Sequence, residues 1–170
     1  MKTIFDLSGR LCWVLSVIAR ALIGLLVLIV VADVAVRNFG FRPLSWAVNS
    51  SELLLLYITF FSIPWLVRNK GHVFVSFLRI ALSDAGKRVL ARIVYLGCVA
   101  LCLYLGWVAL TSMQLAIARN TYEMRNFDIP KWVIFAPMTL AFFLAALEWL
   151  RFALGFDDYY DSDPLANGGH

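Results

Sequence analysis

The sequence is poor in charged residues. Asp, Glu, Lys and Arg together make up 15% of its 170 residues, whereas about a quarter is typical of a soluble protein. Hydrophobic residues make up 62%, which is more than a soluble fold of this length can bury. This composition excludes an ordinary soluble enzyme and a disordered chain. It predicts an integral membrane protein whose helices face lipid.

Ligands for metals and cofactors are equally scarce. The chain has two histidines, His72 and His170, and three cysteines that show no zinc-binding spacing. A bis-histidine haem, a structural zinc and a di-iron centre each need a larger ligand set. Cys98 and Cys102, one helical turn apart, are interpreted as packing residues. We therefore expect no cofactor, no metal and no enzyme activity on this chain.

Long apolar runs predict an all-α fold with four transmembrane helices in one domain, residues 1–156. The expected spans cover about residues 12–37, 52–67, 89–118 and 132–153. The third span is the clearest, because residues 93–118 contain no charge. Both termini are therefore expected on the same side of the membrane.

Two interpretations of the N-terminal stretch stay open. In one, the first helix starts near Cys12 and tilts, so that Arg20 reaches a membrane interface. In the other, residues 3–19 lie along the membrane surface as an amphipathic helix. A cleaved signal peptide is disfavoured, because Arg20 interrupts the apolar run and no small-residue cleavage site follows.

Two further segments lie outside the expected spans. Residues 73–82 are mostly apolar with one charge, Arg79, and are too few to cross a bilayer. They predict a short interfacial helix between spans two and three. Residues 157–170 are acidic and predict a mobile, solvated tail.

The basic residues predict the orientation. The side with the termini and the 68–92 loop carries ten of them: Lys2, Arg10, Arg20, Arg68, Lys70, Arg79, Lys87, Arg88, Arg92 and Arg151. The opposite side carries five: Arg37, Arg42, Arg119, Arg125 and Lys131. The positive-inside rule then predicts that both termini are cytoplasmic. Because these residues alternate with apolar runs and form no basic patch, we expect no nucleic-acid partner.

Four charges lie in or next to the expected spans: Arg20, Asp33, Glu52 and Glu148. We place each near a span end, where a charge costs less than the roughly 3 kcal/mol of the bilayer centre, and interpret them as ionic support. Glu52 is expected in the first turn of span two, behind a cap at residues 49–51. It either pairs with Arg37 or Arg42, or serves as the proton site of a small exporter.

A pattern of nine residues resembles the small membrane subunit of TRAP (tripartite ATP-independent periplasmic) transporters over about residues 15–150. The pattern consists of Arg37, Trp46, Glu52, Arg68, Gly71, His72, Pro130, Trp132 and Pro137. In this pattern Arg37 closes span one and Pro137 opens span four. Two positions depart from the family: Asn38 stands where tyrosine is frequent, and Ser76 where aspartate is frequent.

The resemblance implies a non-catalytic subunit of a bacterial inner-membrane transporter. Its partners would be a large multi-span membrane subunit, which carries the substrate and sodium sites, and a periplasmic substrate-binding protein. The cargo of such systems is an organic acid, such as a C4-dicarboxylate or a sialic acid. We expect the periplasmic loops to help dock the binding protein through Arg37, Arg42, Arg119 and Arg125.

The alternative is a self-sufficient, proton-coupled exporter that works as a homodimer with Glu52 as its proton site. Such exporters resemble this chain in having four spans. They are shorter, however, and they carry the carboxylate inside the first span. The position of Glu52 therefore favours the transporter subunit.

Overall fold

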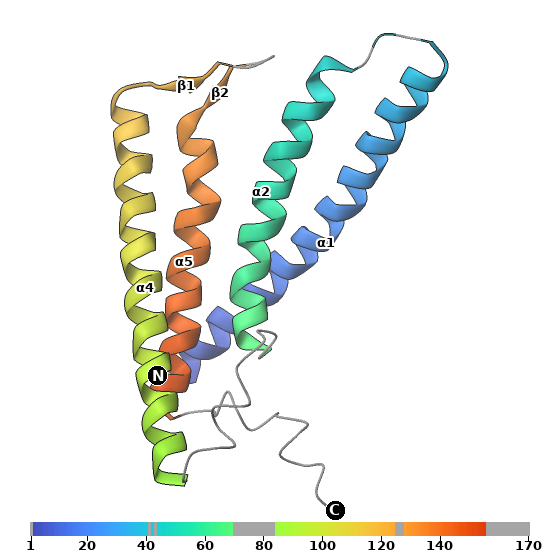
Figure 1. Cartoon of the computed structure of the whole chain (residues 1–170). Helices are drawn as coiled ribbons and strands as arrows, with labels where there is room; N and C mark the ends of the chain where they lie inside the picture. Colours follow the sequence, from blue (N-terminus) through green and yellow to red (C-terminus); the bar gives the residue numbers. More distant parts are fainter. Residues whose placement is uncertain (1, 41, 43, 70–83, 125–127, 156–170) are drawn as a thin grey trace, which may run out of the picture.

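A computed structural model describes residues 2–40, 42, 44–69, 84–124 and 128–155 (Figure 1). The predicted interfacial helix at 73–82 and the acidic tail at 157–170 lie outside the described residues. The same holds for three residues that the sequence singled out: Gly71, His72 and Arg125.

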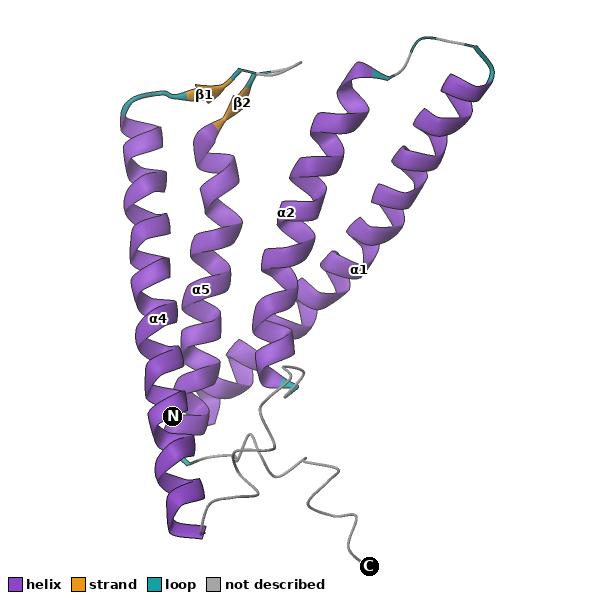
Figure 2. Cartoon of the chain, viewed as in Figure 1, coloured by secondary structure: helices purple, strands orange, loops and turns teal. Residues whose placement is uncertain are grey.

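Four long helices make up almost all of the described chain. They are α1 (Lys2–Asn38), α2 (Ser45–Arg68), α4 (Asp84–Ala118) and α5 (Lys131–Ala153). Each is long and apolar enough to cross a membrane, which confirms the prediction of an all-α protein with four spans. Two short antiparallel strands, β1 (Tyr122–Glu123) and β2 (Ile129–Pro130), close the α4–α5 connection (Figure 2). In this pair Tyr122 lies opposite Pro130.

The helices lie side by side in the order α4, α5, α2, α1 (Figure 1). Within the described part of the chain, α4 packs along α5 and not along α1 or α2. We call the end with the α1–α2 loop and the β-strands the loop end, and the end where α1 begins and α5 finishes the basal end. Toward the loop end the described helices therefore lie in one layer, whereas at the basal end α1 crosses α2 and also contacts α5.

The layer is held most tightly at the basal end. There Val67 of α2, Tyr95 of α4, and Trp149 and Phe152 of α5 form a buried cluster around Ala145. Small residues allow transmembrane helices to approach closely, since lipid supplies no hydrophobic force between them. Toward the loop end the α1–α2 and α4–α5 hairpins diverge (Figure 1).

Three helices begin earlier than the expected spans: α1, α2 and α4, the last at Asp84. α1 is one continuous helix from Lys2, so the structure does not have the separate surface helix that we considered for residues 3–19. α2 begins at Ser45, which places Glu52 two turns inside the helix and not in its first turn. A contact with α1 explains the earlier start of α2. A carboxylate oxygen of Asp33 in α1 accepts the backbone N–H of Leu44 at 2.9 Å. Asp33 thus supplies the acceptor that we had assigned to residues 49–51.

Pro137 lies inside α5 and does not open it, because the helix already begins at Lys131. A proline has no N–H, so the carbonyl four residues earlier, that of Val133, loses its helical partner. The Tyr57 hydroxyl of α2 donates to this carbonyl at 2.9 Å. Pro137 therefore makes possible a hydrogen bond between the two central helices.

We predict that Tyr57→Phe lowers the free energy of unfolding in detergent by about 1 kcal/mol, because it leaves the Val133 carbonyl without a donor. The loss should largely disappear in a Pro137→Ala background, where the helix can supply its own N–H. Tyr104→Phe, at an exposed position on α4, is the matched control. Equal effects of Tyr57→Phe in both backgrounds would contradict this role of Pro137.

Candidate functional site

A buried ion pair joins three helices at the basal end. Glu148 of α5 is completely buried. One of its carboxylate oxygens, Oε1, lies 2.9 Å from Nη1 of Arg68 at the end of α2. The same oxygen accepts the hydroxyl of Ser8 from α1 at 2.8 Å. A charge inside a membrane protein is tolerated when it is paired and hydrogen-bonded, and Glu148 is both.

Arg68 is also held by the first turns of α1. Its Nη1 donates to the carbonyl oxygen of Phe5 at 3.2 Å. Gly9 faces the guanidinium so closely that a Cβ there would overlap it. The glycine is therefore needed to let the Arg68 side chain pass α1 and reach Glu148.

A second arginine lies near the other carboxylate oxygen of Glu148. Nε of Arg151, one turn further along α5, is 3.7 Å from Oε2. This oxygen has no hydrogen-bond partner among the described residues. The Arg151 guanidinium also lies 5.0 Å from the centre of the Phe152 ring, within cation–π distance. Two guanidinium groups thus surround one carboxylate at this end of the layer.

A second ion pair fixes the loop end of α1. Arg37 contacts the Asp33 carboxylate at 2.6 Å, one helical turn away. We had considered Glu52 as the partner of Arg37, and the structure gives it Asp33 instead. Asp33 therefore holds both Arg37 and the start of α2, as two acceptor oxygens allow.

Between α2 and α5, under the β-strands, lies a groove of about 320 Å³. It is lined by Asn49, Glu52, Leu53, Leu56, Glu123, Ile129, Lys131, Ile134 and Phe135. Glu123 and Lys131 form an exposed ion pair at 3.3 Å. The floor is apolar and the rim carries mixed charge. In the residues that the structure describes, no group of three His, Cys, Asp or Glu could hold a metal ion.

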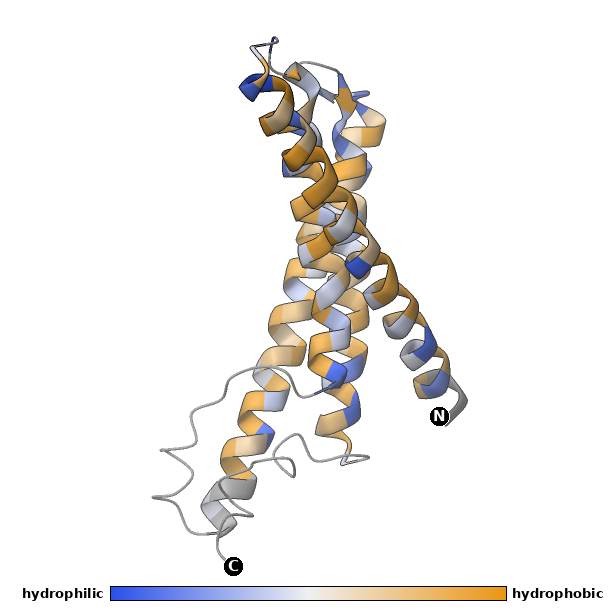
Figure 3. Cartoon of the chain, turned by 90° about the vertical axis from the view of Figure 1, so that its right-hand side faces the viewer, coloured by the Kyte–Doolittle hydropathy of each residue, from blue (hydrophilic) through white to orange (hydrophobic). Residues whose placement is uncertain are grey.

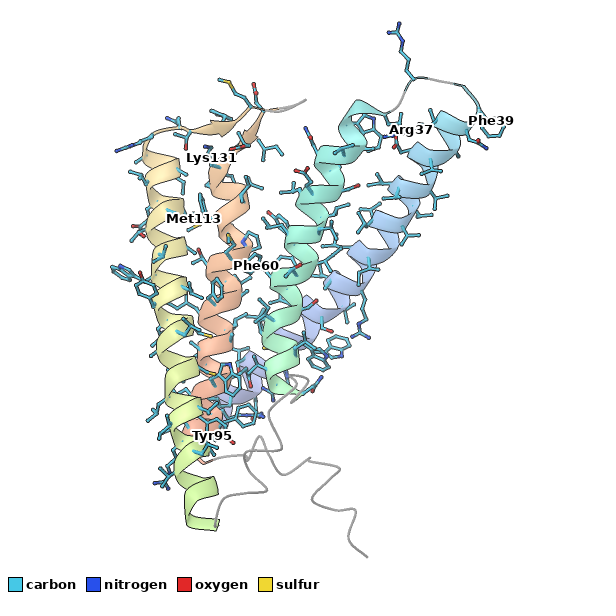
Figure 4. All side chains as sticks on the ribbon, viewed as in Figure 1. Arg37, Phe39, Phe60, Tyr95, Met113 and Lys131 are labelled. Carbon is cyan, nitrogen blue, oxygen red and sulfur yellow. The ribbon has the colours of Figure 1, made fainter. Side chains whose placement is uncertain are left out.

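The other predicted residues lie at the loop end but do not converge on one site. Arg42 and Arg119 are exposed, as are Trp46 at the start of α2 and Trp132 at the start of α5. Figure 4 shows Arg37 and Lys131 at this end, on different helices. Two exposed tryptophans at one level are typical of a membrane–water interface.

The sequence pointed to both Arg68 and Glu148 but did not pair them. Their positions are 80 residues apart in the chain. The sequence did show that each residue is a charge at one end of its span, and that both of these ends are expected on the same side of the membrane. Ser8 and Gly9 carried no such signal, because their roles depend on contacts with Glu148 and Arg68 that exist only in the folded structure.

We predict that Glu148→Ala destabilises the protein by up to about 3 kcal/mol, since it leaves the partly buried guanidinium of Arg68 without its carboxylate partner. Replacing both residues, as Glu148→Leu with Arg68→Met, should recover most of that loss. Lys131→Met, which breaks an exposed pair, should cost less than about 1 kcal/mol. Thermal unfolding in detergent measures all three. A double variant as unstable as Glu148→Ala would contradict the pairing.

Comparison with known proteins assigns the family. The family model described as tripartite ATP-independent periplasmic transporters, DctQ component, matches residues 26–155. Searches of curated proteins and of solved structures returned no match. The matched region contains α2, α4 and α5 entirely, together with the loop-end part of α1. The chain belongs to the DctQ family, the small membrane component of TRAP transporters.

Proposed function

We propose that this chain is a non-catalytic scaffold for the large membrane subunit of its transporter. The observation that carries the proposal is the side-by-side layer that the described helices form toward the loop end. A layer does present two broad faces. A moving transport domain needs a fixed frame, and such a layer can widen one.

The charges of the spans support the same proposal. Glu148 and Arg68 bond to each other and to α1, and Asp33 bonds to Arg37 and to the start of α2. These groups hold helices together and are therefore committed to structure. On this proposal the sodium ions and the organic acid bind to the large subunit.

The loop end is the proposed docking face for the periplasmic substrate-binding protein. Arg42 and Arg119 are exposed there, whereas Arg37 is engaged by Asp33. The proposed location is the bacterial inner membrane. The excess of Lys and Arg on the basal side supports cytoplasmic termini.

The first test is to purify a tagged chain from its native membrane in mild detergent and identify what accompanies it. We expect a stoichiometric large multi-span membrane protein. A homodimer without any partner would contradict the scaffold and favour the exporter. In that case Glu52→Gln should abolish proton-coupled export, whereas on our proposal the same variant leaves the complex assembled.

The docking face can be tested separately by charge reversal. We predict that Arg42→Glu combined with Arg119→Glu slows uptake that depends on the binding protein by about tenfold, because rim charges steer protein encounter. The loss should shrink at high salt, where exposed charges are screened. Arg10→Glu, an exposed arginine at the basal end, is the control. Unchanged uptake with both loop-end arginines reversed would contradict docking at this face.

A further inference from the structure

Arg20 lies in the middle of α1, because the helix extends from Lys2 to Asn38. At the basal end Gly9 contacts the Arg68 guanidinium, and at the loop end Asp33 bonds to Leu44. These two contacts fix the position of α1 along its axis relative to α2. At 1.5 Å per residue, Arg20 is about 16 Å along the helix from Gly9 and about 20 Å from Asp33. We take these two contacts to mark the two ends of the membrane span, and we infer that the backbone of Arg20 lies within the hydrocarbon layer between them.

The guanidinium of Arg20 is bonded only to its own helix within the described residues. Nε donates to the Ser16 carbonyl at 3.2 Å, and Nη2 donates to the Ser16 hydroxyl at 3.2 Å. Both acceptors are neutral, and the side chain is exposed on the surface of the layer. A guanidinium has five N–H donors, so among the described residues the charge and several donors have no partner. An unpaired arginine inside the hydrocarbon layer is costly, and the cost reaches about 3 kcal/mol or more at the bilayer centre.

A glycine follows Arg20 by one turn on the same face of α1. Gly24 is exposed, and a Cβ built on it would meet nothing within 4 Å. Glycine in a helix costs up to about 1 kcal/mol relative to alanine, and none of the described residues comes close enough to Gly24 to require the missing side chain. A small residue on the outside of a membrane helix is typical of close approach by another helix. Gly24 thus indicates that another helix packs on the face of α1 that carries Arg20.

We propose that the face of α1 formed by Arg20, Gly24 and Val27 receives a transmembrane helix of the large subunit, with an Asp or Glu of that helix pairing with Arg20. This inference rests on the proposed function. The chemistry is that of a carboxylate, because the planar guanidinium binds a carboxylate through two parallel hydrogen bonds. Close approach at Gly24 would exclude lipid and strengthen the pair.

Two other occupants fit the same face less well. In a symmetric pair of this chain through the α1 face, the two Arg20 charges would approach each other and repel. A lipid phosphate would have to leave the interface, because the bonds to Ser16 hold the guanidinium about 10 Å along α1 from Gly9. A carboxylate on a membrane helix meets neither obstacle.

The first test compares variants of the tagged chain in the native complex. Arg20→Leu should reduce the large subunit recovered with the chain about tenfold or more, as expected when one partner of a buried charge pair is removed. Gly24→Leu keeps the arginine, blocks close approach and should give a similar loss. Arg10→Leu is the matched control and should recover the wild-type amount. Because leucine suits lipid better than arginine, undiminished recovery with Arg20→Leu would overturn the proposal.

The second test maps the occupant directly. A photo-crosslinking residue at Val27, on the Arg20 face, should label a segment of the large subunit that contains an Asp or Glu. The same residue at Leu25, on roughly the opposite side of α1, should not label that segment. Val27 crosslinks only to lipid or to a second copy of this chain would overturn the proposal. Failure of the wild-type chain to retain any large subunit would instead contradict the scaffold function itself.

Discussion

The buried carboxylate of Glu148 is the constraint on which the arrangement of the helices depends. A carboxylate inside a membrane protein must be paired, so α2 ends where Arg68 can reach it and α1 begins where Ser8 can bond to it. Gly9 keeps the path of Arg68 open. With the basal ends drawn together at one point, the two hairpins are free to diverge toward the loop end, and the groove between α2 and α5 lies in that opening.

The lipid environment explains why the four helices can lie side by side. In a soluble bundle, apolar faces turn inward, but in lipid they have no such preference, and association depends on small residues and on hydrogen bonds. The specific contacts here join α1 to α2, α1 and α2 to α5, and α5 to α4. Figure 3 shows hydrophobic colour along all four helices, with hydrophilic colour mainly near their ends. Both faces of the layer therefore remain available to lipid or to a partner subunit.

Composition was enough to predict the number of spans, because an uncharged run of membrane length has few alternatives. The sequence also marked Asp33 and Glu148 as charges in or next to the spans, and Arg68 as part of the pattern that resembles the family. It could not reveal their partners, since contacts between distant helices leave no local pattern. For that reason Pro137 was expected to open α5, although its effect is to free a carbonyl for Tyr57. The sequence did not place Arg20 at the middle of α1, because that position depends on how far the helix extends toward Lys2.

On the proposed function, the helices form a frame whose buried charges serve assembly. The most direct measurement of this claim is an experimental structure of the chain with the large membrane subunit in a lipid nanodisc, with the transported solute present. Our account predicts that the chain forms one layer at the edge of the complex, with Glu148 and Arg68 paired and the solute bound to the large subunit alone. Solute bound between α2 and α5 of this chain would contradict it.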